Sequence, residues 1–197
     1  MSHFDKKAKD WDKGATRVNG TLTIAEAIAS RHNFHKEMEV LDFGVGTGLL
    51  GFEIASKVKK VYGVDTSTKM LEKVKEKNSE QLSIEPILQD IVKTPLERSF
   101  DALVSSMTLH HIEDLELFFT TIYQNVKENG FIAIADLESE DGTFHSDNTG
   151  VFHFGFEETA LVETAKKCGF KNVMFENVNI IEKPHRNFGV FLLTATK

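Results

Sequence analysis

Three glycines at alternate positions carry the clearest chemical signal in this sequence. Gly44, Gly46 and Gly48 follow the apolar run Val40-Leu41-Asp42-Phe43 and come just before a segment with helical periodicity. Glycine lacks a Cβ and tolerates positive φ, so a ligand can approach the backbone closely at such a loop. The helix that follows offers unpaired N–H groups to a carboxylate or a phosphate. The segment therefore predicts a ligand-binding loop between a strand and a helix.

Two aspartates follow the next two predicted strands. Asp65 lies 17 residues after Gly48, where a carboxylate can accept from both hydroxyls of a ribose. Asp90 ends the third strand and is placed to meet the exocyclic amine of an adenine, with Ile91 as an apolar face for the ring. Ligands of open α/β sheets bind at the carboxyl ends of the strands, so these features indicate one nucleoside site. The alternative is that both aspartates cap helices.

Histidines gather near the fourth strand and in a long loop. His110 and His111 follow residues 100–104, and a histidine near neutral pKa suits proton removal. We expect either one to act as a general base, with packing or helix capping as the alternative. His145 and His153 lie in or beside the loop 137–156, whose aromatic content predicts a pocket wall.

The elements that must position these residues form an alternating series. Apolar strands are predicted at 40–43, 61–64, 84–88, 100–104 and 131–135, and helices at 49–58, 67–78, 115–126 and 157–168. Such alternation implies a parallel sheet covered on both faces. Two last strands, 173–181 and 188–195, have a short connection that predicts a hairpin with an antiparallel final strand. Two helices are predicted before the series, a charged one around 5–14 that carries Trp11 and an amphipathic one at 21–32.

Composition narrows the function classes. The 197 residues predict a single domain, and the net charge of −7 disfavours nucleic-acid binding. No apolar run approaches the roughly 18 residues that a membrane helix needs. The lone Cys168 and the lack of a signal-peptide core favour a soluble protein in a reducing, cytoplasmic compartment. One cysteine and scattered histidines predict no metal site.

These motifs resemble those of class I S-adenosylmethionine-dependent methyltransferases. The resemblance rests on Asp42-x-Gly44-x-Gly46-x-Gly48, on Asp65 and Asp90, and on the segments 100–112 and 125–131. It runs from about residue 38 to the end of the chain, and the opening residues 4–12 also resemble the lid of the small-molecule branch.

The resemblance implies a Rossmann-like, doubly wound α/β fold with seven strands in the order 3-2-1-4-5-7-6 and strand 7 antiparallel. It implies one methyltransferase domain over residues 1–197, with an N-terminal helical lid at 1–32 and a substrate-side loop at 137–156. It also assigns the cofactor contacts: Gly44, Gly46 and Gly48 to the amino-acid moiety, Asp42 to the loop or the ammonium, Asp65 and Thr66 to the ribose, Asp90 and Ile91 to the adenine, the backbone near Ser105 and Ser106 to the methionyl portion, and Trp11 to closure of the pocket.

The implied activity is in-line methyl transfer from S-adenosylmethionine to a small molecule, with a protein acceptor as an alternative. A catalytically silent S-adenosylmethionine-binding protein is a second hypothesis. An NAD(P)-dependent oxidoreductase is a third, because Gly46-x-Gly48-x-x-Gly51 fits a dinucleotide fingerprint and Tyr123-x-x-x-Lys127 has the spacing of short-chain dehydrogenases. The oligomeric state is left open.

Overall fold

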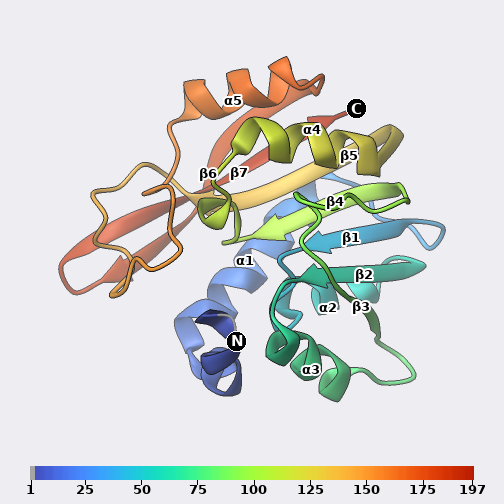
Figure 1. The fold of residues 1–197 in the computed structure, drawn as a ribbon, viewed down its shortest axis with the longest axis horizontal. Helices are drawn as coiled ribbons and strands as arrows, with labels where there is room; N and C mark the ends of the chain where they lie inside the picture. Colours follow the sequence, from blue (N-terminus) through green and yellow to red (C-terminus); the bar gives the residue numbers. More distant parts are fainter. Residues whose placement is uncertain (1–2) are drawn as a thin grey trace.

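A seven-stranded mixed sheet forms the centre of the computed structural model, which describes residues 3–197 (Figure 1). The order is β3-β2-β1-β4-β5-β7-β6, and β7 runs antiparallel to both of its neighbours. This order confirms the expected fold. The strands are β1 (Glu39–Phe43), β2 (Lys60–Asp65), β3 (Ile84–Leu88), β4 (Phe100–Ser106), β5 (Val126–Leu137), β6 (Lys171–Lys183) and β7 (Arg186–Thr196).

Helices cover both faces of the sheet because its inner strands are apolar on both sides. Along β5, Ile132 and Ile134 join one core cluster, whereas Ala133 and Ala135 join the other. The helices α1 (Ala15–Arg31), α2 (Leu49–Ala55) and α3 (Thr68–Lys77) contribute to the cluster with the alanines, and α4 (Leu115–Asn125) and α5 (Glu158–Lys167) contribute to the opposite one. Among residues 3–197, no helix is long and apolar enough to span a bilayer.

The N-terminal segment differs from the expected helix. It forms two 3₁₀ turns, η1 (His3–Lys6) and η2 (Ala8–Lys13), and α1 begins at Ala15, earlier than the predicted residue 21. Gly14 is extended between the turns and α1. The charged residues of this segment bond to the glycine loop and to α3, so tertiary contacts fix its conformation in place of a long helix.

Two other boundaries shift for identifiable reasons. Val126 pairs with Phe100 of β4, so the backbone leaves α4 at Asn125 and the Asn129-Gly130 turn is absorbed into β5. Asn129 accordingly has a φ of +63°. The final hairpin is longer than predicted, because pairing continues to Lys183 and Arg186 around a two-residue turn.

Candidate functional site

The glycine loop after β1 has the backbone conformation that its residue types predict. Gly44, Gly46 and Gly48 have φ values of +68°, +53° and +89°. The amides of Gly44 and Val45 donate to the carbonyl of Val64 at 2.9 and 3.0 Å, which holds the loop against the end of β2. A Cβ on Gly44 would lie 2.3 Å from the side chain of Thr108, so only glycine fits there.

Asp65 joins this loop to the start of α3. Its Oδ2 accepts from the amide of Gly46 at 2.9 Å, and its Oδ1 accepts from the amide of Ser67 at 2.8 Å. Burial raises the pKa of Asp65, against the lowering effect of these backbone donors, and the nearby charge of Asp5 raises it further. The side chain therefore lies on the glycine loop, and it also supports the helix start as the capping hypothesis proposed.

Asp42 is a second buried acid beneath the loop. It is 2% exposed, and its Oδ2 has no hydrogen-bond partner among residues 3–197. Burial raises the pKa of Asp42 to about 8, with a smaller lowering by the amide of Gly51 and a further rise from Asp65. A Cβ on Gly51 would lie 2.8 Å from Oδ2 of Asp42, so this glycine serves helix–strand packing.

The carboxyl end of β3 is more exposed to solvent than the carboxyl end of β2. Asp90 pairs with Lys93 at 2.9 Å and accepts from the amides of Val92 and Lys93, which is a local turn geometry. Ile91 is 1% exposed and packs in the core, so its side chain presents no free face in this structure. Thr66 is exposed beside Asp65.

The end of β4 closes the other side of the glycine loop. Ser105 is buried and donates to the carbonyl of Phe43 at 2.8 Å, so its hydroxyl ties β4 to β1. Ser106 is half-buried, and its carbonyl accepts from Thr108 at 3.2 Å. Met107 has a φ of +56°, which turns the chain sharply toward the histidines that follow.

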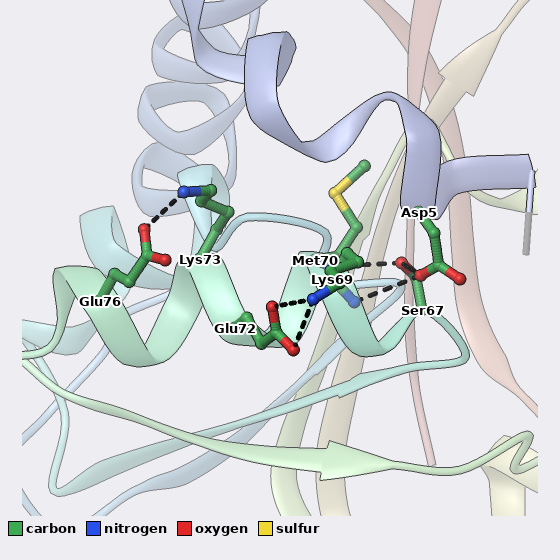
Figure 2. Close-up of polar contacts among 7 residues, drawn as sticks. All are labelled: Asp5, Ser67, Lys69, Met70, Glu72, Lys73 and Glu76. Atoms are coloured by element: carbon green, nitrogen blue, oxygen red, sulfur yellow. Dashed lines mark hydrogen bonds and ion pairs between the residues drawn. The ribbon is translucent and has the colours of Figure 1, made fainter. Parts of the chain in front are cut away.

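The N-terminal segment lies across the glycine loop and the start of α3. Asp5 accepts from the Ser67 hydroxyl at 2.7 Å and from the amide of Lys69 at 3.2 Å, as Figure 2 shows. Asp12 accepts from Thr47 of the loop and pairs with Lys77 at 2.9 Å.

Trp11 also reaches the loop. A Cβ added to Gly46 would lie 3.9 Å from the indole nitrogen of Trp11. Its ring lies 6.0 Å from that of Phe4, which in turn contacts the ring of His111 at 4.9 Å. The segment thus contacts both the loop and the histidines.

The histidines themselves form a cluster that sequence reasoning only partly foresaw. The ring of His110 lies 4.1 Å from that of His111 and 4.9 Å from that of His145. His110 is 1% exposed, and its Nδ1 lies 2.7 Å from Oδ1 of the fully buried Asp136. We call His110, His111, His145 and Asp136 the histidine cluster.

Desolvation controls the charge of two cluster members. Burial, followed by the charge of His110, lowers the pKa of His111 and that of His145 to about 4. Both rings are therefore neutral at pH 7. The Nδ1 of His111 lies 2.6 Å from the carbonyl of Gly150, which ties this ring to the long loop.

His153 has a structural contact instead. Its Nε2 lies 2.9 Å from the carbonyl of Ile112, and the amide of Phe152 donates to the carbonyl of His110 at 2.9 Å. These bonds hold the long loop against the cluster. No group of three or more His, Cys, Asp or Glu in the described part of the chain could hold a metal ion.

Asp136 and Thr108 were missed by sequence reasoning. Asp136 directly follows the apolar run that predicts the fifth strand, and a charged residue at a strand end was the only signal available for it. Its bond to His110 joins residues 26 positions apart. Thr108 had no signal, because its contact with Gly44 depends on the turn at Met107.

Comparison with known proteins adds family information to this geometry. A family model described as "Methyltransferase domain" matches residues 41–134. An uncharacterised methyltransferase of Schizosaccharomyces pombe is 30% identical over 190 residues, covering 86% of this chain and 65% of that protein. A malonyl-[acyl-carrier protein] O-methyltransferase of Priestia megaterium is 29% identical over 143 residues, covering 72% of this chain and 51% of that protein. The chain therefore spans 51% to 65% of the length of these two relatives.

A solved structure shares the fold over nearly the whole chain. The DhpI–SAH complex has a TM-score of 0.78 and 18% identity, and the match covers 98% of this chain and 92% of that one. The sheet order, the left-handed glycine loop and the sequence matches agree. Most of the chain is therefore similar in sequence and in fold to the class I S-adenosylmethionine-dependent methyltransferases.

Proposed function

We propose that this protein transfers a methyl group from S-adenosylmethionine to a small-molecule acceptor. The observation that carries the proposal is the set of carboxylates around the glycine loop. Asp65 is bonded to the amide of Gly46 and Asp12 to the hydroxyl of Thr47, whereas Asp42, with its pKa raised to about 8, lies buried and protonated beneath the loop. A negative surrounding of this kind suits a ligand with a sulfonium and an ammonium group.

The same carboxylates argue against a dinucleotide. A pyrophosphate would bring two negative charges to a loop that already has Asp65 on one of its amides. Tyr123 packs against Phe170, and Lys127 pairs with Asp101 near the start of β4, far along the strand from its carboxyl end. Tyr123 and Lys127, which have the spacing of short-chain dehydrogenases, therefore lie away from the edge of the sheet at which a ligand would bind.

The residues of the chain have separate parts in this proposal. The glycine loop and Asp65 would bind the cofactor, with Asp90 at the edge of its base. S-adenosylmethionine supplies an electrophilic methyl group, so the protein mainly contributes proximity and alignment. His110 removes a proton from the acceptor, and Trp11 excludes water from the loop.

Names of relatives support oxygen as the receiving atom. The Priestia megaterium relative is named as an O-methyltransferase. We favour a small acceptor because the long loop is held against the histidine cluster by the bonds of Gly150 to His111 and of Phe152 to His110.

Thermal unfolding with added ligand tests the cofactor assignment. S-adenosylhomocysteine at 100 times its Kd should stabilise the protein by about 2.7 kcal/mol. A shift with NAD and none with S-adenosylhomocysteine would reverse the assignment. Tight cofactor binding without turnover on any acceptor would instead favour the silent binding protein.

A further inference from the structure

Asp136, near the end of β5, is a buried carboxylate surrounded by donors. Its Oδ1 accepts from the amide of Leu137 at 2.7 Å in addition to facing Nδ1 of His110, and its Oδ2 accepts from the amide of His110 at 3.1 Å. Burial alone raises the pKa of Asp136, but the charge and hydrogen bond of His110 outweigh it and hold the pKa below the ordinary value. Asp136 is therefore ionised.

An ionised carboxylate fixes the tautomer of the ring that it holds. It can only accept hydrogen bonds, so Nδ1 of His110 carries a hydrogen, and Nε2 is the ring nitrogen left to exchange a proton with a ligand. Nε2 is buried and has no hydrogen-bond partner among residues 3–197. Leaving a buried polar atom without a partner is destabilising, so this position is suited to a ligand that forms a hydrogen bond with Nε2.

The neighbouring groups leave this task to His110. Burial lowers the pKa values of His111 and His145 to about 4, so both rings are weak bases, and Nδ1 of His111 faces the carbonyl of Gly150 in place of a carboxylate. Lys183 approaches from the β6–β7 hairpin but donates to the carbonyl of Phe144. His110 is thus the cluster histidine whose Nδ1 faces a carboxylate, that of Asp136.

We propose that Asp136 is the positioning residue that makes Nε2 of His110 a general base, and that the acceptor is a neutral hydroxyl. This inference deepens the proposed function and rests on it. A hydroxyl group on the acceptor can give its proton to Nε2 of His110. A carboxylate acceptor has no proton to give and would meet the negative charge of Asp136.

The step balances with the cofactor as the co-reactant. The acceptor O–H bond breaks, and its proton moves to Nε2 of His110. The acceptor oxygen forms a bond to the methyl carbon, the carbon–sulfur bond breaks, and its electron pair stays on sulfur. The imidazolium that results is paired with Asp136 until the proton leaves to solvent.

The tautomer can be measured without knowing the acceptor. Protein labelled with ¹⁵N-histidine and saturated with S-adenosylhomocysteine should show His110 as the Nδ1–H form in long-range ¹H–¹⁵N spectra, assigned with the His110→Gln variant. Asp136→Asn should shift the ring toward the Nε2–H form. A wild-type His110 that carries its hydrogen on Nε2 would overturn the inference.

Turnover tests the acceptor class. Wild-type protein and deuterated-methyl S-adenosylmethionine are mixed with hydroxyl, amine and carboxylate compounds matched in skeleton, and mass spectrometry locates the label. Label on a hydroxyl oxygen is expected, with kcat lowered about 10- to 100-fold in Asp136→Asn and an unchanged KM for the cofactor. Glu128→Gln, toward the opposite end of β5 and paired with Lys197, is the control that should match wild type.

The outcomes separate the two proposals. Label on nitrogen or on a carboxylate overturns the hydroxyl inference and leaves the methyltransferase proposal intact. Failure of the cofactor to bind in calorimetry overturns the proposed function itself. Cofactor binding with no labelled product from any compound overturns the inference and favours the silent binding protein.

Discussion

The glycine loop and the histidine cluster lie at the same edge of the sheet but are built in different ways. The loop spans residues 44–48 and is anchored by Asp65, within one β-α-β unit. The cluster assembles His110, Asp136 and His145 from three separate segments. The loop depends on backbone conformation, and the cluster depends on the proximity of side chains. The glycine loop is therefore sensitive to glycine substitution, and the histidine cluster to loss of single polar atoms.

The largest expected effect is at Gly44. Gly44→Ala should lower the free energy of unfolding by about 2–5 kcal/mol, because about 1–2 comes from the left-handed φ and about 1–3 from the clash with Thr108. Gly150→Ala is the matched control, since Gly150 has a φ of +76° with nothing within 4 Å of the added Cβ. Urea denaturation measures both, and equal losses would show that the Thr108 contact does not matter.

On the other side of the comparison, His110→Ala should slow catalysis and spare cofactor binding. The loss of a general base predicts a kcat about 100-fold lower, with the S-adenosylhomocysteine affinity unchanged in calorimetry. His111→Ala should have a smaller effect, because its Nδ1 is bonded to the loop at Gly150. Identical rates for wild type and His110→Ala at every pH would remove this role.

Asp65 and Asp90 should differ in how much each contributes to cofactor affinity. Asp65→Ala strands the amides of Gly46 and Ser67 and should weaken S-adenosylmethionine binding by about 1–3 kcal/mol. Asp90→Ala should weaken it less, because the Asp90 side chain is 36% exposed and already paired with Lys93. Calorimetry on both variants ranks them, and an equal or larger loss at Asp90 would reverse the assignment.

A fall in pH should change the stability contribution of Asp42 and that of the histidine cluster in opposite directions. The pKa of Asp42 is raised to about 8, so its contribution to stability grows as pH falls from 8 toward 4. The pKa values of His111 and His145 are lowered to about 4, so their contribution is lost as pH falls from 6.5 toward 4. In Asp42→Asn, the free energy of unfolding measured from pH 8 to pH 4 should gain less from acidification than it does in wild type. A His111→Gln, His145→Gln double variant should lose less stability in acid, and unchanged pH slopes would contradict this difference.

The smallest expected effect joins the two sides through the N-terminal segment. Asp12→Asn removes the charged acceptor of Thr47 and should speed S-adenosylhomocysteine release about 2- to 10-fold, the equivalent of one net hydrogen bond. Asp10→Asn is the control, because the exposed side chain of Asp10 is paired with the neighbouring Lys13 and not with the glycine loop. Stopped-flow measurements compare them, and equal release rates would show that Asp12 does not hold the segment closed.

This difference also explains what could be predicted from the sequence. The strands, the glycine loop and the place of Asp65 follow from local patterns of apolar and glycine residues, and the structure confirms the predicted sheet order. The partner of His110 could not be predicted, because Asp136 belongs to another strand and no periodicity links the two. Residues 3–13 form two 3₁₀ turns in place of the single short helix expected around 5–14, because Asp5 and Asp12 contact distant hydroxyls. The roles of the cofactor contacts and of the histidines stay predictions.

The loop after β5 leaves and returns to the sheet at nearly one point. Glu138 and Phe156 form a bridge, and the amide of Ser139 donates to the carbonyl of Phe156 at 3.1 Å. Closing a longer or shorter insert between such anchors costs little, since the entropy of a loop changes slowly with its length. The stretch between these anchors can therefore be replaced by one of different length at a small entropic cost. Under the proposed function, replacement of this stretch would change the acceptor preference and leave the glycine loop unchanged.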